Sequence, residues 1–175
     1  MSRLIKFRRD YLLMCTDEYT TLQLANDAIQ THPLFLGHNK FSEASMCRLL
    51  IVNRVNMVEN LLRFWQQLDQ HKILKSYFPP DDNVPNDKRL ESLKNAFKFE
   101  DFDVKDNIFN KYLALKYLRN FITHGDFRLD QEEFVKKQGY PTILGELTIE
   151  HSKDIVNVSS EMIQYVCKLS PSLRI

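Results

Sequence analysis

The sequence predicts an all-α protein, an antiparallel bundle of four to five helices with minor extra helices. Three observations favour this class. Apolar residues recur at helical spacing along most of the chain. The 175 residues include 4 glycines and 6 prolines, too few for the many turns of an all-β protein. Hydrophobic residues make up 43%, enough to build the core of one domain, which we expect to span 1–175.

The first helices are predicted from capping residues and breakers. A short helix with one apolar face is expected within 3–14. Thr16 and Asp17 can cap a second helix, whose apolar residues continue at helical spacing until Pro33 and Gly37 end it.

The longest helix is expected next, with Ser42 as its capping residue. The chain from Ala44 to Leu74 contains no glycine or proline. Its apolar stripe is wide enough to contact more than one neighbouring helix. The stripe consists of Leu49, Leu50, Val52, Val55, Met57, Val58, Leu61, Leu62, Trp65 and Leu68.

The middle of the chain contains the main loop. Residues 77–85 (YFPPDDNVP) are predicted to be a connection inside the single domain, because neither half alone has enough helices to bury its stripes. Asn86 or Asp87 can cap a short helix that carries Leu90, Leu93, Ala96 and Phe97. Residues 98–105 are predicted to be irregular.

A further helix is predicted from Asp106 or Asn107 to Gly125, with Ile108, Phe109, Tyr112, Leu115, Leu118 and Ile122 as its buried stripe. The charged stretch 126–139 is expected to be a short helix or an ordered loop. Alternation over 142–149 permits a short extended segment or hairpin. A last helix then carries Ile155, Val158, Met162, Val166 and Leu169 on one face and ends at Pro171.

Charge and cysteine content constrain the environment and the partners. The formal net charge of +1 does not require a nucleic-acid partner. Arg3, Lys6, Arg8 and Arg9 can form a local basic patch, but so short a cluster is expected to be a solvated helix face or a frayed terminus. The 3 cysteines form no CxxC pair, which indicates a reducing compartment. No apolar run approaches the ~18–20 residues of a membrane span. We expect a soluble, cytoplasmic protein that needs no membrane, metal or cofactor.

The stretch 117–125 (YLRNFITHG) carries the residues that suggest chemistry. Asn120 and His124 are four positions apart and share one face of a helix. Arg119 and His124 are five positions apart, so a regular helix separates them by roughly 140° around its axis. They can meet if Gly125 allows the last turn to unwind, or if a second copy of the helix faces the first.

A purely structural role explains the same residues. Arginine and histidine in the last turn of a helix interact favourably with its dipole and can cap its free carbonyls. Arg119 can also pair with Asp126 or with another acid.

The stretch resembles the motif of the HEPN superfamily, many of whose members are metal-independent endoribonucleases. That motif is an arginine followed by a polar residue, a few variable residues and a histidine, near the end of a helix in a bundle. Arg119 and His124 match the invariant pair, Asn120 matches the polar position, and Gly125 follows as is common. Some family toxins carry a tyrosine two residues after the histidine that a partner antitoxin modifies, whereas this chain has Asp126.

The resemblance implies a dimer in which two motifs face each other and form a composite active site. It implies RNA as the substrate, with the ribose 2′-OH as nucleophile and a 2′,3′-cyclic phosphate and a 5′-OH as products. His124 would move the proton, Arg119 would bind phosphate oxygens, and Asn120 would hold the histidine or a phosphate oxygen. An antitoxin or regulatory protein is a further expected partner. The alternative is a catalytically inactive module of this fold that dimerises or binds a nucleotide or RNA.

Overall fold

The computed structural model describes residues 39–68, 73–78, 84–99, 104–125 and 127–168, together with Thr20 and Leu24. In these ranges every regular element is helical and no strand is present. The elements are α2 (Asn39–Leu68), η1 (Ile73–Ser76), α3 (Asn86–Phe99), α4 (Asp106–His124), α5 (Leu129–Lys137), η2 (Leu144–Glu146) and α6 (Ile149–Lys168), where η denotes a 3₁₀ helix. The predicted all-α class is confirmed.

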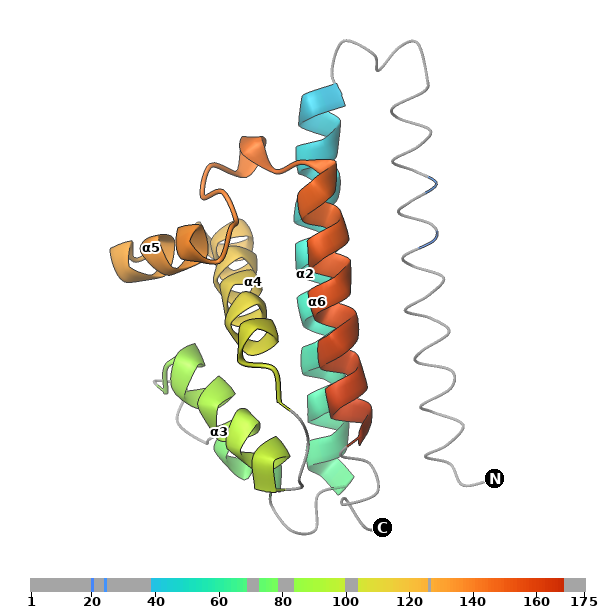
Figure 1. Ribbon diagram of the computed structural model, residues 1–175, viewed down its shortest axis with the longest axis vertical. Helices are drawn as coiled ribbons and strands as arrows, with labels where there is room; N and C mark the ends of the chain where they lie inside the picture. Colours follow the sequence, from blue (N-terminus) through green and yellow to red (C-terminus); the bar gives the residue numbers. More distant parts are fainter. Residues whose placement is uncertain are drawn as a thin grey trace.

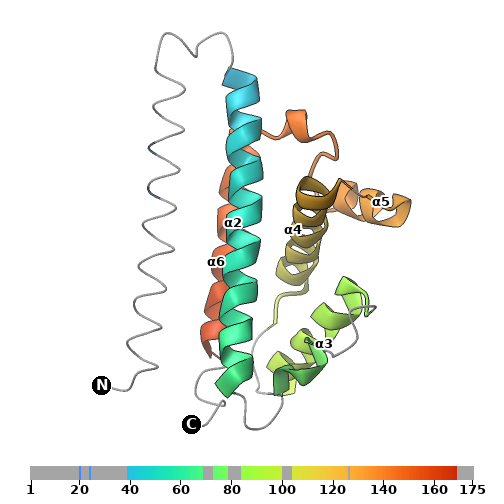
Figure 2. The ribbon, with the colours of Figure 1, turned by 180° about the vertical axis from the view of Figure 1, so that it is seen from behind.

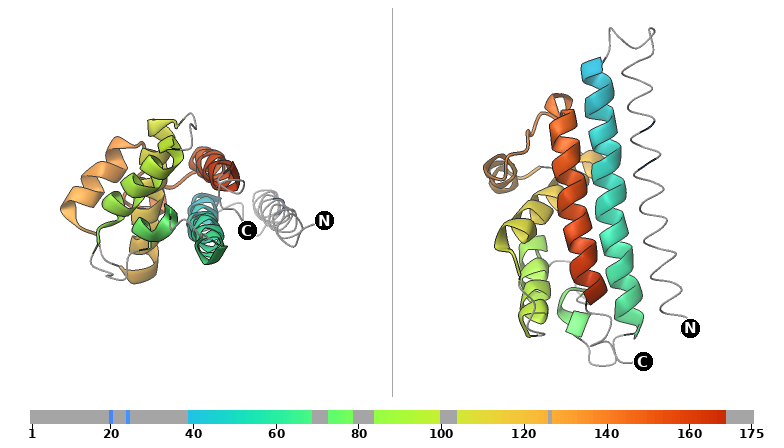
Figure 3. Two further views of the ribbon diagram at one scale, coloured as in Figure 1. Left: turned by 90° about the horizontal axis from the view of Figure 1, so that it is seen from below. Right: turned by 45° about the vertical axis from the view of Figure 1, so that its right-hand side comes forward.

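Two long helices, α2 and α6, form the main helix pair of the bundle. α2 and α6 lie side by side along most of their length and run in the same direction (Figures 1 and 2). α4 packs on both of them and runs in the opposite direction, since the backbone N–H of Lys105 at its start bonds the hydroxyl of Tyr165 near the end of α6 at 3.2 Å. α3 and α5 contact α4 on the side away from the α2–α6 pair (Figure 3).

The hydrophobic core confirms the predicted stripes. On α4, Ile108, Phe109, Tyr112, Leu115 and Leu118 are buried, and Ile122 packs against the core. The wide stripe of α2 is buried between α4 and α6, and Trp65 is fully buried within it, as expected of a core anchor. Two described residues of this stripe are not buried, since Leu49 is 55% exposed and Val52 is half-buried, and the side chain of Leu68 lies outside the described part of the structure. None of the described helices combines the length and the apolar composition that crossing a bilayer requires.

Several predicted boundaries shift in the structure. α2 begins at Asn39, so the predicted capping residue Ser42 lies inside the helix. α3 begins at Asn86 as predicted, but it continues through Phe99 into the stretch predicted to be irregular. The stretch 126–139 contains a helix, α5, which is one of the two expected outcomes.

The hairpin predicted near 142–149 is wrong. This segment contains the short 3₁₀ helix η2, whose backbone closes with a Glu146 N–H to Ile143 carbonyl bond of 2.9 Å. The N–H groups of Thr148 and Ile149 bond the side chains of His151 and Glu43. The backbone N–H groups that a β-ladder would need therefore form a turn and cap α6 instead. The alternation of apolar and polar residues reflects the burial of single side chains such as Leu147.

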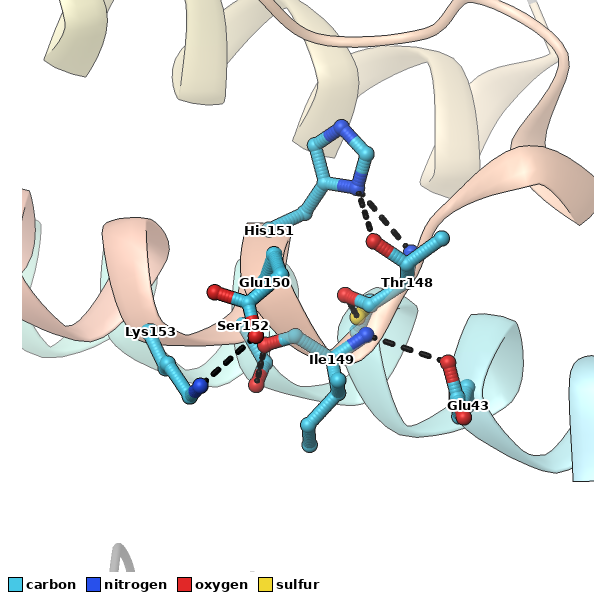
Figure 4. A network of polar contacts seen from close by, with 8 residues as sticks. Glu43, Thr148, Ile149, Glu150, His151, Ser152 and Lys153 are labelled. Carbon is cyan, nitrogen blue, oxygen red and sulfur yellow. Dashed lines mark hydrogen bonds and ion pairs between the residues drawn. The ribbon is translucent and has the colours of Figure 1, made fainter.

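The start of α6 is capped from two directions (Figure 4). His151 Nδ1 accepts from the backbone N–H of Thr148 at 3.0 Å, so this nitrogen carries no proton and the Thr148 hydroxyl, 2.8 Å away, donates to it as well. Glu43 on α2 accepts from the N–H of Ile149 at 3.1 Å. Burial raises the pKa of the Cys47 thiol to about 12, so the thiol stays protonated and donates to the Thr148 carbonyl. These bonds join the first turns of α2 and α6.

Some predictions fall on residues that the structure does not describe. These include the helix within 3–14 with its basic cluster, most of the second helix, Pro33, Gly37 and Pro171. Thr20 and Leu24, from the second predicted helix, are described and are helical and exposed. Asp126 also lies outside the described residues.

Candidate functional site

The candidate site lies at the C-terminal end of α4. The helix stays regular up to His124, because the N–H of Gly125 bonds the carbonyl of Phe121 at 2.8 Å. Gly125 follows in the left-handed conformation, with φ 74°. Of the two arrangements predicted to bring Arg119 and His124 together, unwinding of the last turn is therefore wrong. Within one chain the two residues remain on different sides of α4.

His124 is exposed and makes no hydrogen bond or ion pair with any residue in the described ranges. It is the last residue of α4, where the helix dipole favours a cationic or hydrogen-bonding side chain. Its imidazole is therefore accessible to a ligand from solvent, or to a second copy of the chain.

Arg119 lies on the side of α4 that faces α2. It follows Tyr112 and Lys116 at spacings of seven and three residues, which places the three side chains on one face. Its Nε atom is buried and has no hydrogen-bond partner among the described residues. Its charge lowers the pKa of Glu59 on α2, although no ion pair between the two is formed. Arg119 thus borders a buried polar cluster, whereas His124 borders solvent.

The polar cluster is centred on the carboxylate of Glu59. Glu59 Oε1 lies 2.9 Å from Lys116 Nζ, and it accepts hydrogen bonds from the hydroxyls of Tyr77 at 2.5 Å and Tyr112 at 3.2 Å. Lys116 Nζ also donates to the Tyr77 hydroxyl at 2.9 Å. Every group in the cluster except Arg119 Nε therefore has a partner, which is what burial of polar groups requires.

The carboxylate of Glu59 is the negative charge that lies near two cations, Lys116 and Arg119. Burial alone would raise the pKa of Glu59, but the Lys116 ammonium and the Tyr77 hydroxyl outweigh it and hold that pKa below its usual value of 4.5. Burial lowers the pKa of Lys116, and Arg119 lowers it further against the pull of Glu59. With one negative and two positive groups, Glu59, Lys116 and Arg119 carry a net charge of +1 at the inner side of the motif.

The cluster tyrosines act as hydrogen-bond donors. Burial and the Glu59 carboxylate raise the pKa values of Tyr77 and Tyr112 well above the usual 10.0. Both hydroxyls therefore stay protonated and direct their protons at Glu59.

Asn120 lies on another side of α4 and opens onto a surface cleft of about 370 Å³. The cleft is bounded by the end of α4 and by the first turns of α3 and α5. Its other lining residues are Val84, Pro85, Asn86, Arg89, Arg128 and Gln131. Asn120 and His124 are one turn apart on the same face of α4, so His124 lies one turn beyond the lining residue Asn120 and is not itself among the described residues that line the cleft.

The structure adds residues that the sequence interpretation did not select. Lys116 interrupts the apolar run Tyr112 to Leu118, and an ionisable residue in such a run signals a buried polar partner. Glu59 gives a weaker signal, because it is followed by the polar Asn60. Arg89 and Arg128 carry no comparable signal, because only the fold brings them to one cleft. Within the described ranges, no group of histidine, cysteine and acidic side chains is arranged to hold a metal ion.

The predicted residues are thus divided between two surroundings. Asn120 and His124 share a solvent-facing side of α4, and Arg119 borders the buried Glu59 cluster. Comparison with protein-family models, with curated proteins and with solved structures found no match to this chain.

Proposed function

We propose that this protein is a metal-independent endoribonuclease of the HEPN type whose active site is completed by a second copy of the chain. His124 is the residue that moves the proton, Arg119 stabilises charge on the phosphate, and Asn120 positions the RNA. The protein then acts as a toxin or a defence effector in the cytoplasm, under the control of an antitoxin or another regulatory protein.

The observation that supports this function best is the exposure of His124 at the end of an otherwise anchored helix. General acid–base catalysis requires a histidine that a substrate can reach. An exposed imidazole one turn from the polar cleft at Asn120 meets this requirement. The excess positive charge of the Glu59 cluster, at whose edge the half-buried Arg119 lies, supports a role in balancing a developing negative charge.

The proposed reaction needs only a proton carrier and a fixed cation. A neutral His124 accepts the proton of the ribose 2′-OH while the 2′ oxygen bonds to phosphorus. The P–O5′ bond breaks, and the imidazolium returns the proton to the departing 5′ oxygen. The products are a 2′,3′-cyclic phosphate and a 5′-OH. Arg119 from the second chain binds the non-bridging oxygens, because the regular helix keeps its own Arg119 away from His124.

The direct test is cleavage of a labelled RNA in the presence of EDTA by the wild type, His124→Ala and Arg119→Ala. Wild-type cleavage that leaves a 2′,3′-cyclic phosphate and falls at least ~100-fold in His124→Ala is the expected result. Equal activity of all three proteins would remove the assignment of the site.

The composite site has a sharper test. If Arg119 and His124 of one site come from different chains, co-refolding the two inactive variants creates mixed dimers with one intact site. About half of all dimers are mixed, so roughly a quarter of the wild-type activity returns. If each chain carries a complete site, mixing restores no activity.

The second candidate is a catalytically inactive module of the same fold that dimerises or binds RNA or a nucleotide. The position of Arg119 beside the Glu59 cluster favours it, because an arginine there also serves the stability of the bundle. This function predicts no cleavage by the wild type, together with the same oligomeric state in the wild type and in His124→Ala.

A further inference from the structure

The cleft beside Asn120 has the composition of an anion site. Among the described residues that line it, two are arginines, Arg89 and Arg128, and none is acidic. Three others, Asn86, Asn120 and Gln131, carry amides. Its volume of about 370 Å³ falls within the ~300–1,000 Å³ range of small-ligand sites. Polar side chains therefore surround a space that one nucleotide unit can enter.

The two arginines are held at the cleft by neighbouring groups. Arg89 Nε donates to the carbonyl of Val84 at 2.9 Å, which fixes its side chain along the rim. Arg128 Nη2 lies 3.2 Å from Asp130, and with the Gln131 amide turned so that its oxygen faces Arg128, that oxygen accepts from Nε at 3.1 Å. Arg128 remains 58% exposed, so the exposed part of its guanidinium can meet a ligand at the cleft mouth.

The position of the cleft relative to His124 suggests how a strand would lie. Asn120 and His124 are four residues apart, which is about 6 Å along the helix axis. This is on the order of one nucleotide along an extended strand. A nucleotide that contacts Asn120 would therefore have its neighbour on the strand near His124.

We propose that this cleft binds the phosphodiester backbone of single-stranded RNA next to the bond that is cleaved, with Arg89 and Arg128 on the phosphate and Asn120 on the adjoining nucleotide. This inference rests on the proposed function for its choice of ligand. Arginine forks recognise phosphate in bidentate fashion, and each contact contributes through counterion release. The overall charge of +1 makes such a local site necessary, because bulk attraction to RNA is weak.

The test measures binding separately from cleavage. The probe is a fluorescein-labelled decamer of 2′-O-methyl-uridine, which has no 2′-OH nucleophile and stays intact. Fluorescence anisotropy gives the dissociation constant of the full chain over about 50–200 mM KCl. Arg128→Gln and Arg89→Gln are compared with Lys137→Gln, which removes an exposed charge from the far end of α5. Circular dichroism melting confirms that each variant is folded.

Weakening of roughly three- to tenfold in each arginine variant, with a salt slope smaller by about one and no change in Lys137→Gln, is the expected result. Unchanged binding by Arg128→Gln, or no binding by the wild type, overturns the cleft assignment even if the protein cleaves RNA. Arginine-dependent binding without any cleavage of ordinary RNA supports the cleft and overturns the proposed function instead.

Discussion

Glu59 on α2 and Lys116 on α4 form an ion pair across the core, with 2.9 Å between Oε1 and Nζ and only 14% and 4% of their side chains exposed. Arg119 is the next residue on the same face of α4 and lacks a carboxylate of its own among the described residues. The position of the motif arginine is thereby linked to the packing of the two helices. The charge around Arg119 and the stability of the core therefore both depend on this cluster.

Glu59→Gln is expected to destabilise the protein by about 3–5 kcal/mol, because it leaves the buried Lys116 ammonium without its counter-charge. Urea unfolding followed by circular dichroism measures the change. Glu150→Gln is the matched control, since it breaks the exposed Glu150–Lys153 pair, whose side chains are 73% and 66% exposed. Similar midpoints for the two variants would show that the buried pair contributes no more than an exposed one.

The same carboxylate predicts how stability depends on pH. The pKa of Glu59 is lowered in the folded state, so its contribution is fully present above the unfolded value of about 4.5 and is lost as pH falls through the folded value. The stability difference between the wild type and Glu59→Gln should therefore shrink on acidification from about pH 7 to about pH 3. Urea unfolding across this range checks the trend, and a constant difference contradicts it.

Gly125→Ala should destabilise the end of α4 by about 1–2 kcal/mol, because φ is +74° at this position and a Cβ is strained there. Gly145→Ala is the control, since Gly145 lies outside the left-handed region and also has open space around its Cα. Thermal unfolding should separate the two variants. Equal midpoints would show that the left-handed cap adds nothing to stability.

His151→Ala should cost about 0.5–1 kcal/mol, because it removes the acceptor for the Thr148 N–H at the start of α6. His151→Glu should recover most of this loss, since glutamate at this position completes a capping box with Thr148. Chemical denaturation measures both changes. A glutamate variant no more stable than the alanine variant would show that the ring acts by packing, for example on Tyr140 at 6.3 Å between ring centroids.

The sequence was sufficient for the fold class and for the buried faces of the helices. The stripe of α4 was predicted correctly because periodicity reports which face of a helix is buried. The segment 142–149 was not, because a short alternating run is compatible with a turn, and only the contacts of Glu43 and His151 show that its N–H groups are used for capping. One of these contacts is local, from Thr148 to His151, and the other comes from Glu43 on α2, more than one hundred positions away in the chain.

For the candidate site, the sequence likewise predicted the spacing of the residues but not their surroundings. Spacing alone gave the ~140° separation of Arg119 and His124, and the regular end of α4 agrees with it. The surroundings of each residue could not be predicted, because Glu59 reaches Arg119 from α2, and Arg89 and Arg128 reach Asn120 from the starts of two other elements. Such neighbours belong to the tertiary packing of helices far apart in the chain.

The two ends of the motif also differ in how freely they can change. A substitution of His124 replaces an exposed side chain outside the described core, whereas a substitution of Arg119 alters the charge balance around Glu59 and Lys116. The packing of the bundle therefore tolerates a change of the histidine. A change of the arginine requires compensation in the core, so the arginine should persist in related chains in which the histidine has been replaced.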